Sequence, residues 1–81
     1  MKIRLLVNTL CAHDQYEMTK YPRPYYVPKP ELPKGKVLDV SDTWSNFYGT
    51  YYRCPLPDDV DGVYSAPVYD IDINKAEIIE Q

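Results

Sequence analysis

Alternating apolar and polar residues predict short β-strands along most of this chain. Residues 2–11 place Ile3, Leu5 and Val7 at every second position, as a half-buried strand does. The same segment also fits a helical stripe, so a helix stays open as the alternative. We favour the strand, because the first residues alternate cleanly and no helix-capping residue precedes them.

The central part of the chain predicts two further strands. Residues 35–40 form a short strand opened by a turn glycine, and residues 41–43 are expected to form a turn. Residues 47–54 are the strongest strand, with aromatic side chains on both faces, and we expect this strand to be central in its sheet. Gly49 is expected to mark a bulge or a close approach of the backbone.

The C-terminal part predicts a half-buried strand followed by a closing element. Residues 68–73 alternate, with Tyr69 expected to face the core and Asp70 and Asp72 expected to keep the outer face in water. Nothing in the sequence indicates that these two carboxylates are buried, as paired acid and base catalysis would require. Residues 74–79 predict a final turn and a short last strand.

Residues 13–34 interrupt this β pattern. Five of the eight prolines lie there together with four of the nine tyrosines. Each proline removes a backbone donor and biases its predecessor toward extended geometry, so regular structure is not expected. Because long loops inside compact domains are usually functional or disordered, and this one is rich in aromatic residues, we expect an extended arm that packs across the domain.

From Lys34 onward, the order of elements resembles the later part of an SH3-like small β-barrel. The resemblance rests on the strand after a Lys-Gly turn, on Trp44 with the aromatic residues 48–53, and on residues 71–79, which resemble a one-turn helix and a last strand. It covers residues 34–80 and implies a mainly β fold. That fold would be a single small SH3-like barrel or a strongly bent antiparallel sheet that carries the long arm. No tandem tryptophan occurs, and fold does not imply function, so no polyproline-binding groove is inferred.

Length and composition set the scale of this fold. At 81 residues the chain has room for one domain with a modest core. Hydrophobic residues make up 44% and charged residues 26%, which is typical of a chain that folds. No apolar stretch approaches the roughly 20 residues that span a bilayer. The first apolar run is also too short for a secretory signal, so we expect a cytoplasmic protein with no membrane partner.

Charge is distributed unevenly along the chain. Residues 1–40 contain seven Lys and Arg against four acids, a balance of +3, whereas residues 41–81 contain two against eight, a balance of −6. We expect the two halves to pack together and partly neutralise each other. The alternative is a bipolar surface that steers a charged partner.

Few residues could carry catalysis or hold a metal. A zinc site would recruit Cys11, His13 and Cys54 with an acid, but structural zinc is usually bound by two tight pairs of ligands. Buried free thiols are the favoured interpretation of the two cysteines, with a disulfide as the alternative. His13 is the only histidine, and its neighbours supply neither an orienting group nor an oxyanion site. We therefore predict no catalytic residues, no metal and no cofactor: the protein is not expected to be an enzyme.

An acidic segment at residues 58–62 invites comparison with calcium-binding loops. The bidentate acid of an EF-hand would fall on Tyr69, so that spacing fails. We expect a solvated acidic loop.

Aromatic residues supply the candidate binding surface. Tyrosine, tryptophan and arginine often dominate binding energy, and the arm interleaves cations with aromatic rings. The candidate partner-binding residues are Tyr21, Arg23, Tyr25, Tyr26, Lys29, Trp44, Tyr48, Tyr51 and Tyr52.

Three functional hypotheses follow from this surface. The first is a non-enzymatic protein-binding module, such as an accessory or inhibitor protein of a phage or mobile element, in which case the host cytoplasm is its location. The second is binding of single-stranded nucleic acid or a phosphorylated small ligand by the basic arm, although a pI of about 4.9 disfavours nucleic acid. The third is a structural subunit of a homo-oligomer.

Overall fold

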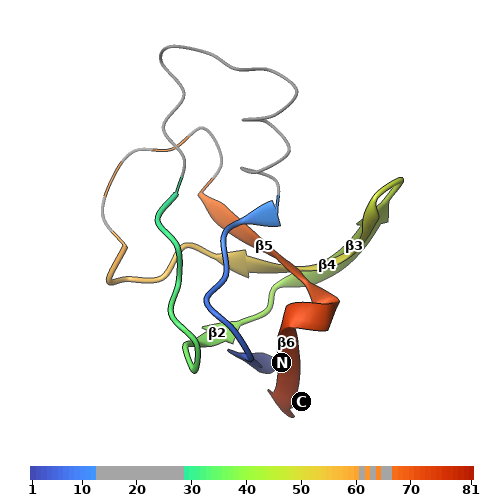
Figure 1. Ribbon diagram of the computed structural model, residues 1–81, viewed down its shortest axis with the longest axis horizontal. Helices are drawn as coiled ribbons and strands as arrows, with labels where there is room; N and C mark the ends of the chain where they lie inside the picture. Colours follow the sequence, from blue (N-terminus) through green and yellow to red (C-terminus); the bar gives the residue numbers. More distant parts are fainter. Residues whose placement is uncertain (13–28, 61, 63, 65–66) are drawn as a thin grey trace.

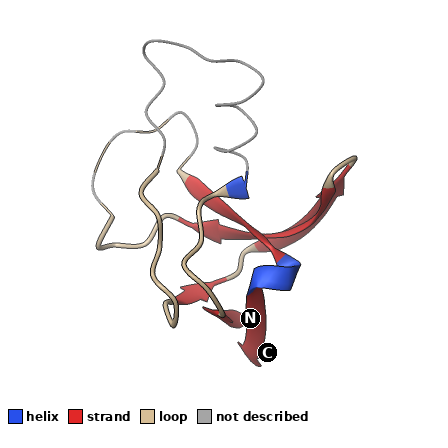
Figure 2. Ribbon diagram, viewed as in Figure 1, coloured by secondary structure: helices blue, strands red, loops and turns tan. Residues whose placement is uncertain are grey.

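Two three-stranded antiparallel sheets make up the described part of the chain (Figures 1 and 2). The computed structural model describes residues 1–12, 29–60, 62, 64 and 67–81. The elements are β1 (Lys2–Leu5), β2 (Val37–Asp39), β3 (Asp42–Asn46), β4 (Gly49–Pro55), β5 (Val68–Asp72), the 3-10 helix η1 (Ile73–Lys75) and β6 (Ala76–Glu80). The first sheet has the strand order β2-β1-β6 and the second the order β3-β4-β5.

This architecture confirms the mainly β prediction. The N-terminal strand is shorter than the predicted residues 2–11: β1 ends at Leu5, and Val7, expected on the buried face, is 47% exposed. The aromatic strand β4 lies between β3 and β5, in the central position expected for it. The turn glycine predicted before β2 is Gly35, whose φ of +89° favours glycine. The two sheets are separate and do not close into one barrel.

Register in the first sheet follows from which side chains are apolar. Ile3 lies opposite Leu38, and both side chains are buried. One residue earlier, Lys2 lies opposite Asp39 on one neighbouring strand and opposite Glu80 on the other, and all three are exposed. A shift by one residue would bury these charges and expose the apolar set, so burial fixes the register.

A single apolar core joins the two sheets. Tyr69 and Ile71 of β5 are completely buried and contribute large side chains to it. Val40, Tyr52, Leu56 and Val60 pack against this core as partly buried residues. The buried members of the core are Ile3, Leu5, Cys11, Leu32, Leu38, Cys54, Tyr69, Ile71 and Ala76.

Ion pairs connect the basic and acidic halves of the chain, as the charge distribution predicted. Arg4 of β1 pairs with Glu77 of β6 at 2.7 Å. Lys36 pairs with Asp59 at 2.7 Å. Exposed pairs of this kind contribute little to stability, about 0–1 kcal/mol each. They do lower the mutual repulsion of the acids in the second half.

The predicted position of the turn near residue 42 is wrong. We expected residues 41–43 to turn, but β3 begins at Asp42 and pairs along its whole length with β4. Ser41 already donates its backbone N–H to the carbonyl of Arg53. β3 is an edge strand whose side chains are mostly exposed, and polar turn-type residues are tolerated there. The actual turn lies at Phe47 and Tyr48, which we had expected inside the strand.

The prediction that Asp70 keeps an outer face wet is also wrong. Asp70 is only 2% exposed, whereas Asp72 is half-buried and accepts a hydrogen bond from the backbone N–H of Asn74 at the start of η1. The reason lies in the partners that reach Asp70 from β3 and β4, described below.

The described part of the chain includes only residues 29–34 of the predicted arm. The backbones of Leu32 and Thr9 exchange two hydrogen bonds of 2.8 Å, and the Tyr69 hydroxyl donates to the carbonyl of Pro30 at 2.8 Å. Residues 29–34 therefore pack against the body of the protein. Residues 13–28 of the predicted arm lie outside the described residues. In the described ranges no helix has the length and apolar character needed to cross a membrane.

Candidate binding surface

An exposed aromatic pair forms the tip of the β3–β4 hairpin, and we call Phe47 and Tyr48 the hairpin tip. Phe47 is 96% exposed and Tyr48 is 64% exposed. Their ring centres lie 5.7 Å apart in an edge-to-face arrangement. Figure 1 shows this hairpin projecting away from the rest of the fold. The tip therefore presents two aromatic rings to the solvent.

The turn itself does not require these aromatic residues. Two-residue hairpin turns usually select Asn, Asp or Gly, whose backbones reach positive φ. No residue other than glycine has a positive φ in the described part of the chain, so Phe47 and Tyr48 keep ordinary backbone geometry. The turn is stabilised by Asn46, whose side-chain oxygen accepts hydrogen bonds from the backbone N–H groups of Tyr48 and Gly49. Polar residues at the tip would serve the fold equally well.

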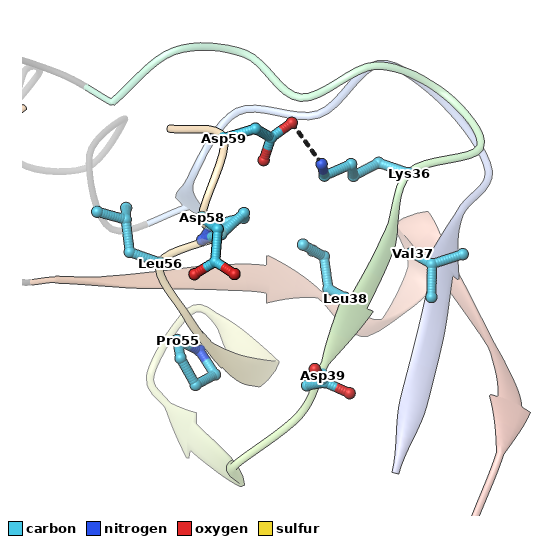
Figure 3. Close-up of a pocket in the computed structure, with 9 residues that line it drawn as sticks. Lys36, Val37, Leu38, Asp39, Pro55, Leu56, Asp58 and Asp59 are labelled. Atoms are coloured by element: carbon cyan, nitrogen blue, oxygen red, sulfur yellow. Dashed lines mark hydrogen bonds and ion pairs between the residues drawn. The ribbon is translucent and has the colours of Figure 1, made fainter. Parts of the chain in front are cut away.

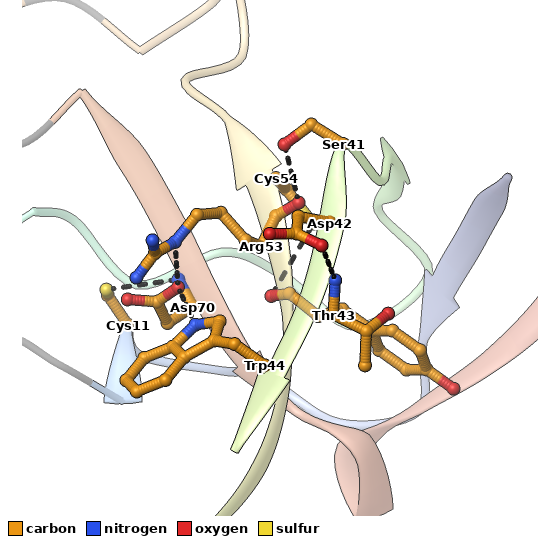
Figure 4. Close-up of polar contacts among 9 residues, drawn as sticks. Cys11, Ser41, Asp42, Thr43, Trp44, Arg53, Cys54 and Asp70 are labelled. Carbon is orange, nitrogen blue, oxygen red and sulfur yellow. Dashed lines mark hydrogen bonds and ion pairs between the residues drawn. The ribbon is translucent and has the colours of Figure 1, made fainter. Parts of the chain in front are cut away.

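A buried carboxylate holds the base of the same hairpin, and we call Trp44, Arg53 and Asp70 the Asp70 cluster (Figure 4). One oxygen of Asp70 accepts a hydrogen bond of 2.9 Å from the indole N–H of Trp44. The same oxygen accepts one of 3.0 Å from Nε of Arg53. The Arg53 guanidinium carbon also lies 4.8 Å from the centre of the Trp44 ring, within range of a cation–π contact.

Strand register brings the members of the Asp70 cluster together. Arg53 of β4 lies directly opposite Asp70 of β5, and on its other side it lies opposite Asp42 of β3. The backbone N–H of Asp70 donates to the Cys11 sulfur at 3.4 Å, at the outer edge of the sheet. Trp44 packs at 5.0 Å from the ring of Tyr51. These contacts fix the hairpin base through three strands.

The predicted binding residues divide into exposed and buried groups. Tyr48 is exposed and Trp44 is half-buried, so both offer surface to a partner. Tyr51 is buried, and Tyr52 packs against the core, so these two rings mainly support the sheet. Lys29 is only 4% exposed.

Buried Lys29 lies among aromatic rings. Its ammonium nitrogen lies 5.6 Å from the ring centre of Tyr64 and 5.9 Å from that of Tyr69. A cation over aromatic faces recovers part of the hydration that it loses on burial. Four predicted residues, Tyr21, Arg23, Tyr25 and Tyr26, lie outside the described residues.

Phe47 is the exposed aromatic residue that the sequence prediction missed. The spacing Asn-Phe-Tyr-Gly contains the indication: two residues between an Asn and a Gly fit a two-residue hairpin turn. We assigned the aromatic pair to a strand because β propensity favoured it.

A hollow of about 470 Å³ lies between β2 and the chain that follows β4 (Figure 3). Both segments contribute to its lining, which is more polar than apolar. Lys36 and Asp59 form an ion pair of 2.7 Å in it. The lining residues are Lys36, Val37, Leu38, Asp39, Pro55, Leu56, Pro57, Asp58 and Asp59.

The ion pair in this hollow has a measurable consequence. A hydrogen bond from Lys36 lowers the pKa of the Asp59 carboxyl below its ordinary value. We expect Lys36→Met to raise the Asp59 pKa toward that value, because it removes both the hydrogen bond and the positive charge. An NMR titration of the side-chain carboxyl carbons checks this prediction, with Asp42 as an internal reference. An Asp59 pKa that is the same in both proteins would contradict the pairing.

The two cysteines are buried free thiols, the interpretation that we favoured. Burial, with a smaller contribution from the nearby Asp70 charge, raises the pKa of the Cys54 thiol to about 12. Cys54 therefore keeps its proton at neutral pH, and a protonated buried thiol is neither a good nucleophile nor a good metal ligand. Among the described residues no three His, Cys, Asp or Glu side chains lie close enough to hold a metal ion. His13 lies outside the described residues.

Comparison with protein-family models, with curated proteins and with solved structures finds no match to this chain. Its function therefore has to be inferred from the surface itself.

Proposed function

We propose that this protein is a non-enzymatic protein-binding module whose hairpin tip inserts into a partner. The observation that carries the proposal is the exposure of Phe47, at 96%, beside the exposed ring of Tyr48. Moving a phenylalanine side chain out of water stabilises a complex by about 1.5–3 kcal/mol. A pocket in the partner that buries these rings would contribute this free energy to binding.

The fixed hairpin base supports this proposal. Trp44 and Arg53 are both anchored on the buried carboxylate of Asp70, so the hairpin starts from a rigid point. A binding element that is already ordered loses less conformational entropy when it binds. Trp44 and Arg53 also belong to the residue types that dominate interfaces, and their half-buried side chains extend the surface behind the tip.

We also propose an SH3-like topology for the fold, and residence in the cytoplasm, of a host cell if a phage encodes the chain. The short η1 helix between β5 and β6 and the pairing of β1 with both β2 and β6 support the topology. The topology does not supply the function, which rests on the hairpin. A phage or mobile-element accessory or inhibitor protein is a suitable class, because such proteins act by occupying a surface of a larger one.

The arm extends the proposed interface. Tyr21, Arg23, Tyr25 and Tyr26 remain candidate contacts for the same partner. The alternative hypothesis, in which the arm binds single-stranded nucleic acid or a phosphorylated ligand, loses one of its cations, because Lys29 is buried. A homo-oligomer through the hairpin tip is the third hypothesis.

Replacing both tip residues by alanine tests the proposal. We expect Phe47→Ala with Tyr48→Ala to weaken binding to the natural partner by about 100-fold, since two aromatic anchors are lost. The free energy of unfolding should change by less than about 0.5 kcal/mol, because exposed side chains contribute little to it. The partner is first captured from the source cell with the tagged wild-type protein, and its affinity for both proteins is then measured by calorimetry.

A control variant and two further measurements make this test specific. Ile78→Ala removes an exposed apolar side chain from the other sheet, and it should bind the partner as the wild type does. Equal affinity of the tip variant and the wild type would contradict the proposal. A steep loss of affinity with salt would instead favour nucleic acid. Self-association in light scattering that the tip variant abolishes would favour the homo-oligomer.

A further inference from the structure

Three of the four edge strands in the two sheets are protected against pairing with another chain. β2 is only three residues long. β6 has an irregular register with β1 and carries the glutamates Glu77 and Glu80. On β5, the backbone N–H of Asp70 is already bonded to the Cys11 sulfur. Short length, bulges, charges and covering contacts are the means by which proteins keep a sheet edge from associating.

β3 is the edge strand that lacks this protection. It extends over five residues and pairs in a regular register with β4, without a bulge or a proline. Its only charged residue is Asp42, at the first position, and four of its five residues are exposed. Figure 1 shows the β3–β4 hairpin projecting away from the rest of the fold. A strand with these properties is a template for pairing with another strand.

The backbone groups of Thr43 and Ser45 face away from β4. In an antiparallel sheet, the backbone groups of successive residues point alternately toward the two neighbouring strands. The N–H of Asp70 bonds a sulfur outside the sheet, so the backbone of its partner Arg53 faces β3. Asp42 lies opposite Arg53, and the outward positions of β3 are therefore residues 43 and 45. Among the described residues, their backbone groups form one hydrogen bond, from the Thr43 N–H to the Asp42 carboxylate at 2.8 Å.

We propose that β3 pairs with β3 of a second copy of this chain, which gives a homodimer with one continuous six-stranded sheet. In the antiparallel register that pairs all five residues, Thr43 of each copy lies opposite Ser45 of the other, and Trp44 lies at the two-fold axis. Because Thr43 and Ser45 both face outward, each of these two pairs exchanges two backbone hydrogen bonds. The same strand supplies both sides of the interface, so the assembly closes at two copies.

The side chains at the two ends of β3 are complementary in this register. Asp42 of one copy lies opposite Asn46 of the other, and no two acids face each other. The side-chain oxygen of Asn46 already accepts hydrogen bonds from the backbone of Tyr48 and Gly49, so its amide N–H groups are left to donate to a carboxylate. The Asp42 carboxylate would exchange its bond within the chain for one across the interface, which frees the Thr43 N–H to pair.

Trp44 leaves the open side of β3 unobstructed. Its indole N–H bonds Asp70 of β5, so its ring lies across β4 and away from the edge. The hairpin tips are also left available in the dimer. Each tip follows β3, so antiparallel pairing places the two tips at opposite ends of the shared pair of strands. The dimer therefore adds a second surface to the proposed function and does not replace the first.

Sedimentation equilibrium of the full chain tests the homodimer. One strand of five residues contributes on each side, so the interface is small, and we expect a dissociation constant on the order of 10–100 micromolar. Protein concentrations from about one tenth to ten times that range cover the transition. In NMR spectra of the same samples, the backbone amide signals of Thr43 and Ser45 should shift with concentration, whereas that of Val37 on the β2 edge should not.

Ser45→Pro removes a backbone N–H that β4 does not use. Proline is tolerated on a sheet edge where its missing N–H faces outward, so the hairpin should still form. The dimer loses one hydrogen bond from each copy and should weaken by about tenfold or more. Val37→Pro is the matched control, because the backbone bonds of its neighbours place its N–H on the open side of β2. This control should dimerise as the wild type does.

Two double variants test the register itself. Thr43→Lys with Ser45→Lys places like charges directly opposite each other in both pairs and should weaken the dimer by about fivefold. Thr43→Glu with Ser45→Lys places opposite charges at the same positions and should dimerise at least as tightly as the wild type. The two proteins differ at residue 43 alone. Both positions are exposed, so both variants should fold even if the proline variant does not.

Four results would overturn the proposal. The first is a monomer at every concentration, and the second is equal weakening by Ser45→Pro and Val37→Pro. The third is equal dimerisation of the two charged double variants. The fourth is a dimer that Phe47→Ala with Tyr48→Ala abolishes, which would assign self-association to the hairpin tip. None of these results depends on the affinity for a different protein, so the homodimer and the proposed function can fail separately.

Discussion

Replacing Asp70 with alanine is expected to lower the free energy of unfolding by roughly 2–4 kcal/mol. One oxygen of this side chain accepts hydrogen bonds from both Trp44 and Arg53, and Asp70 is only 2% exposed. Its removal leaves an indole N–H and a guanidinium without their acceptor. Losing one partner of a fully buried pair costs about 3–5 kcal/mol, but the Arg53 side chain is 39% exposed, so water recovers part of that cost.

Urea unfolding of three variants separates charge from hydrogen bonding in this cluster. Asp70→Asn keeps a side-chain oxygen as acceptor but removes the charge, so it should cost about half as much as Asp70→Ala. A double-mutant cycle with Arg53→Met should give a coupling energy of about 1–3 kcal/mol, because the two residues share one hydrogen bond. A loss below about 0.5 kcal/mol for Asp70→Ala would contradict the cluster as the support of the hairpin base.

Asp70 shows why local patterns could not predict this site. The alternation predicted for residues 68–73 correctly placed Tyr69 and Ile71 toward the core, but Ile73, expected on the same face, is 38% exposed and begins η1. It also placed Asp70 in water, because an acid between apolar residues usually faces solvent. The partners that bury Asp70 come from β3 and β4, 26 and 17 residues earlier in the chain. Only the register of three strands brings them together.

The hairpin shows a different limit, in which two local rules compete. Ser41 and Asp42 are turn-type residues, yet at the edge of a sheet their exposed side chains suit a strand equally well. Phe47 and Tyr48 have high β propensity, yet Asn46 and Gly49 determine the turn between them. The β propensity of a residue indicates whether it suits a strand. The position of the turn follows instead from the hydrogen bonds that the Asn46 side chain accepts.

The hollow depends on contacts that are equally remote in sequence. Charge balance predicted that the basic and acidic halves would partly neutralise each other, and Lys36 with Asp59 is one such pair. Which acid Lys36 reaches is determined by how β2 lies beside the chain after β4. That arrangement comes from the shared core, where Leu38 and Cys54 are both buried. Sequence patterns indicate that such pairs form, but not which residues form them.

Alkaline pH is expected to destabilise this protein through Cys54. Its thiol has an ordinary pKa of 9.0, and burial raises the pKa to about 12 in the folded protein. Between these values the unfolded chain loses the thiol proton while the folded chain keeps it. The contribution of Cys54 to stability is therefore complete below pH 9 and decreases by about 1.4 kcal/mol for each pH unit above it. The total loss by pH 12 is roughly 4 kcal/mol.

A comparison of slopes isolates this contribution from the other groups that titrate at alkaline pH. Tyrosines and lysines titrate in the same range, but they are present in both the wild type and Cys54→Ala. The variant should be less stable at pH 7, because it leaves a small cavity in the core. Between pH 9 and 11 its unfolding free energy, measured in urea, should fall less steeply than that of the wild type by about 1.4 kcal/mol per pH unit. Parallel slopes in the two proteins would show that the Cys54 thiol ionises as readily in the folded state as in the unfolded state.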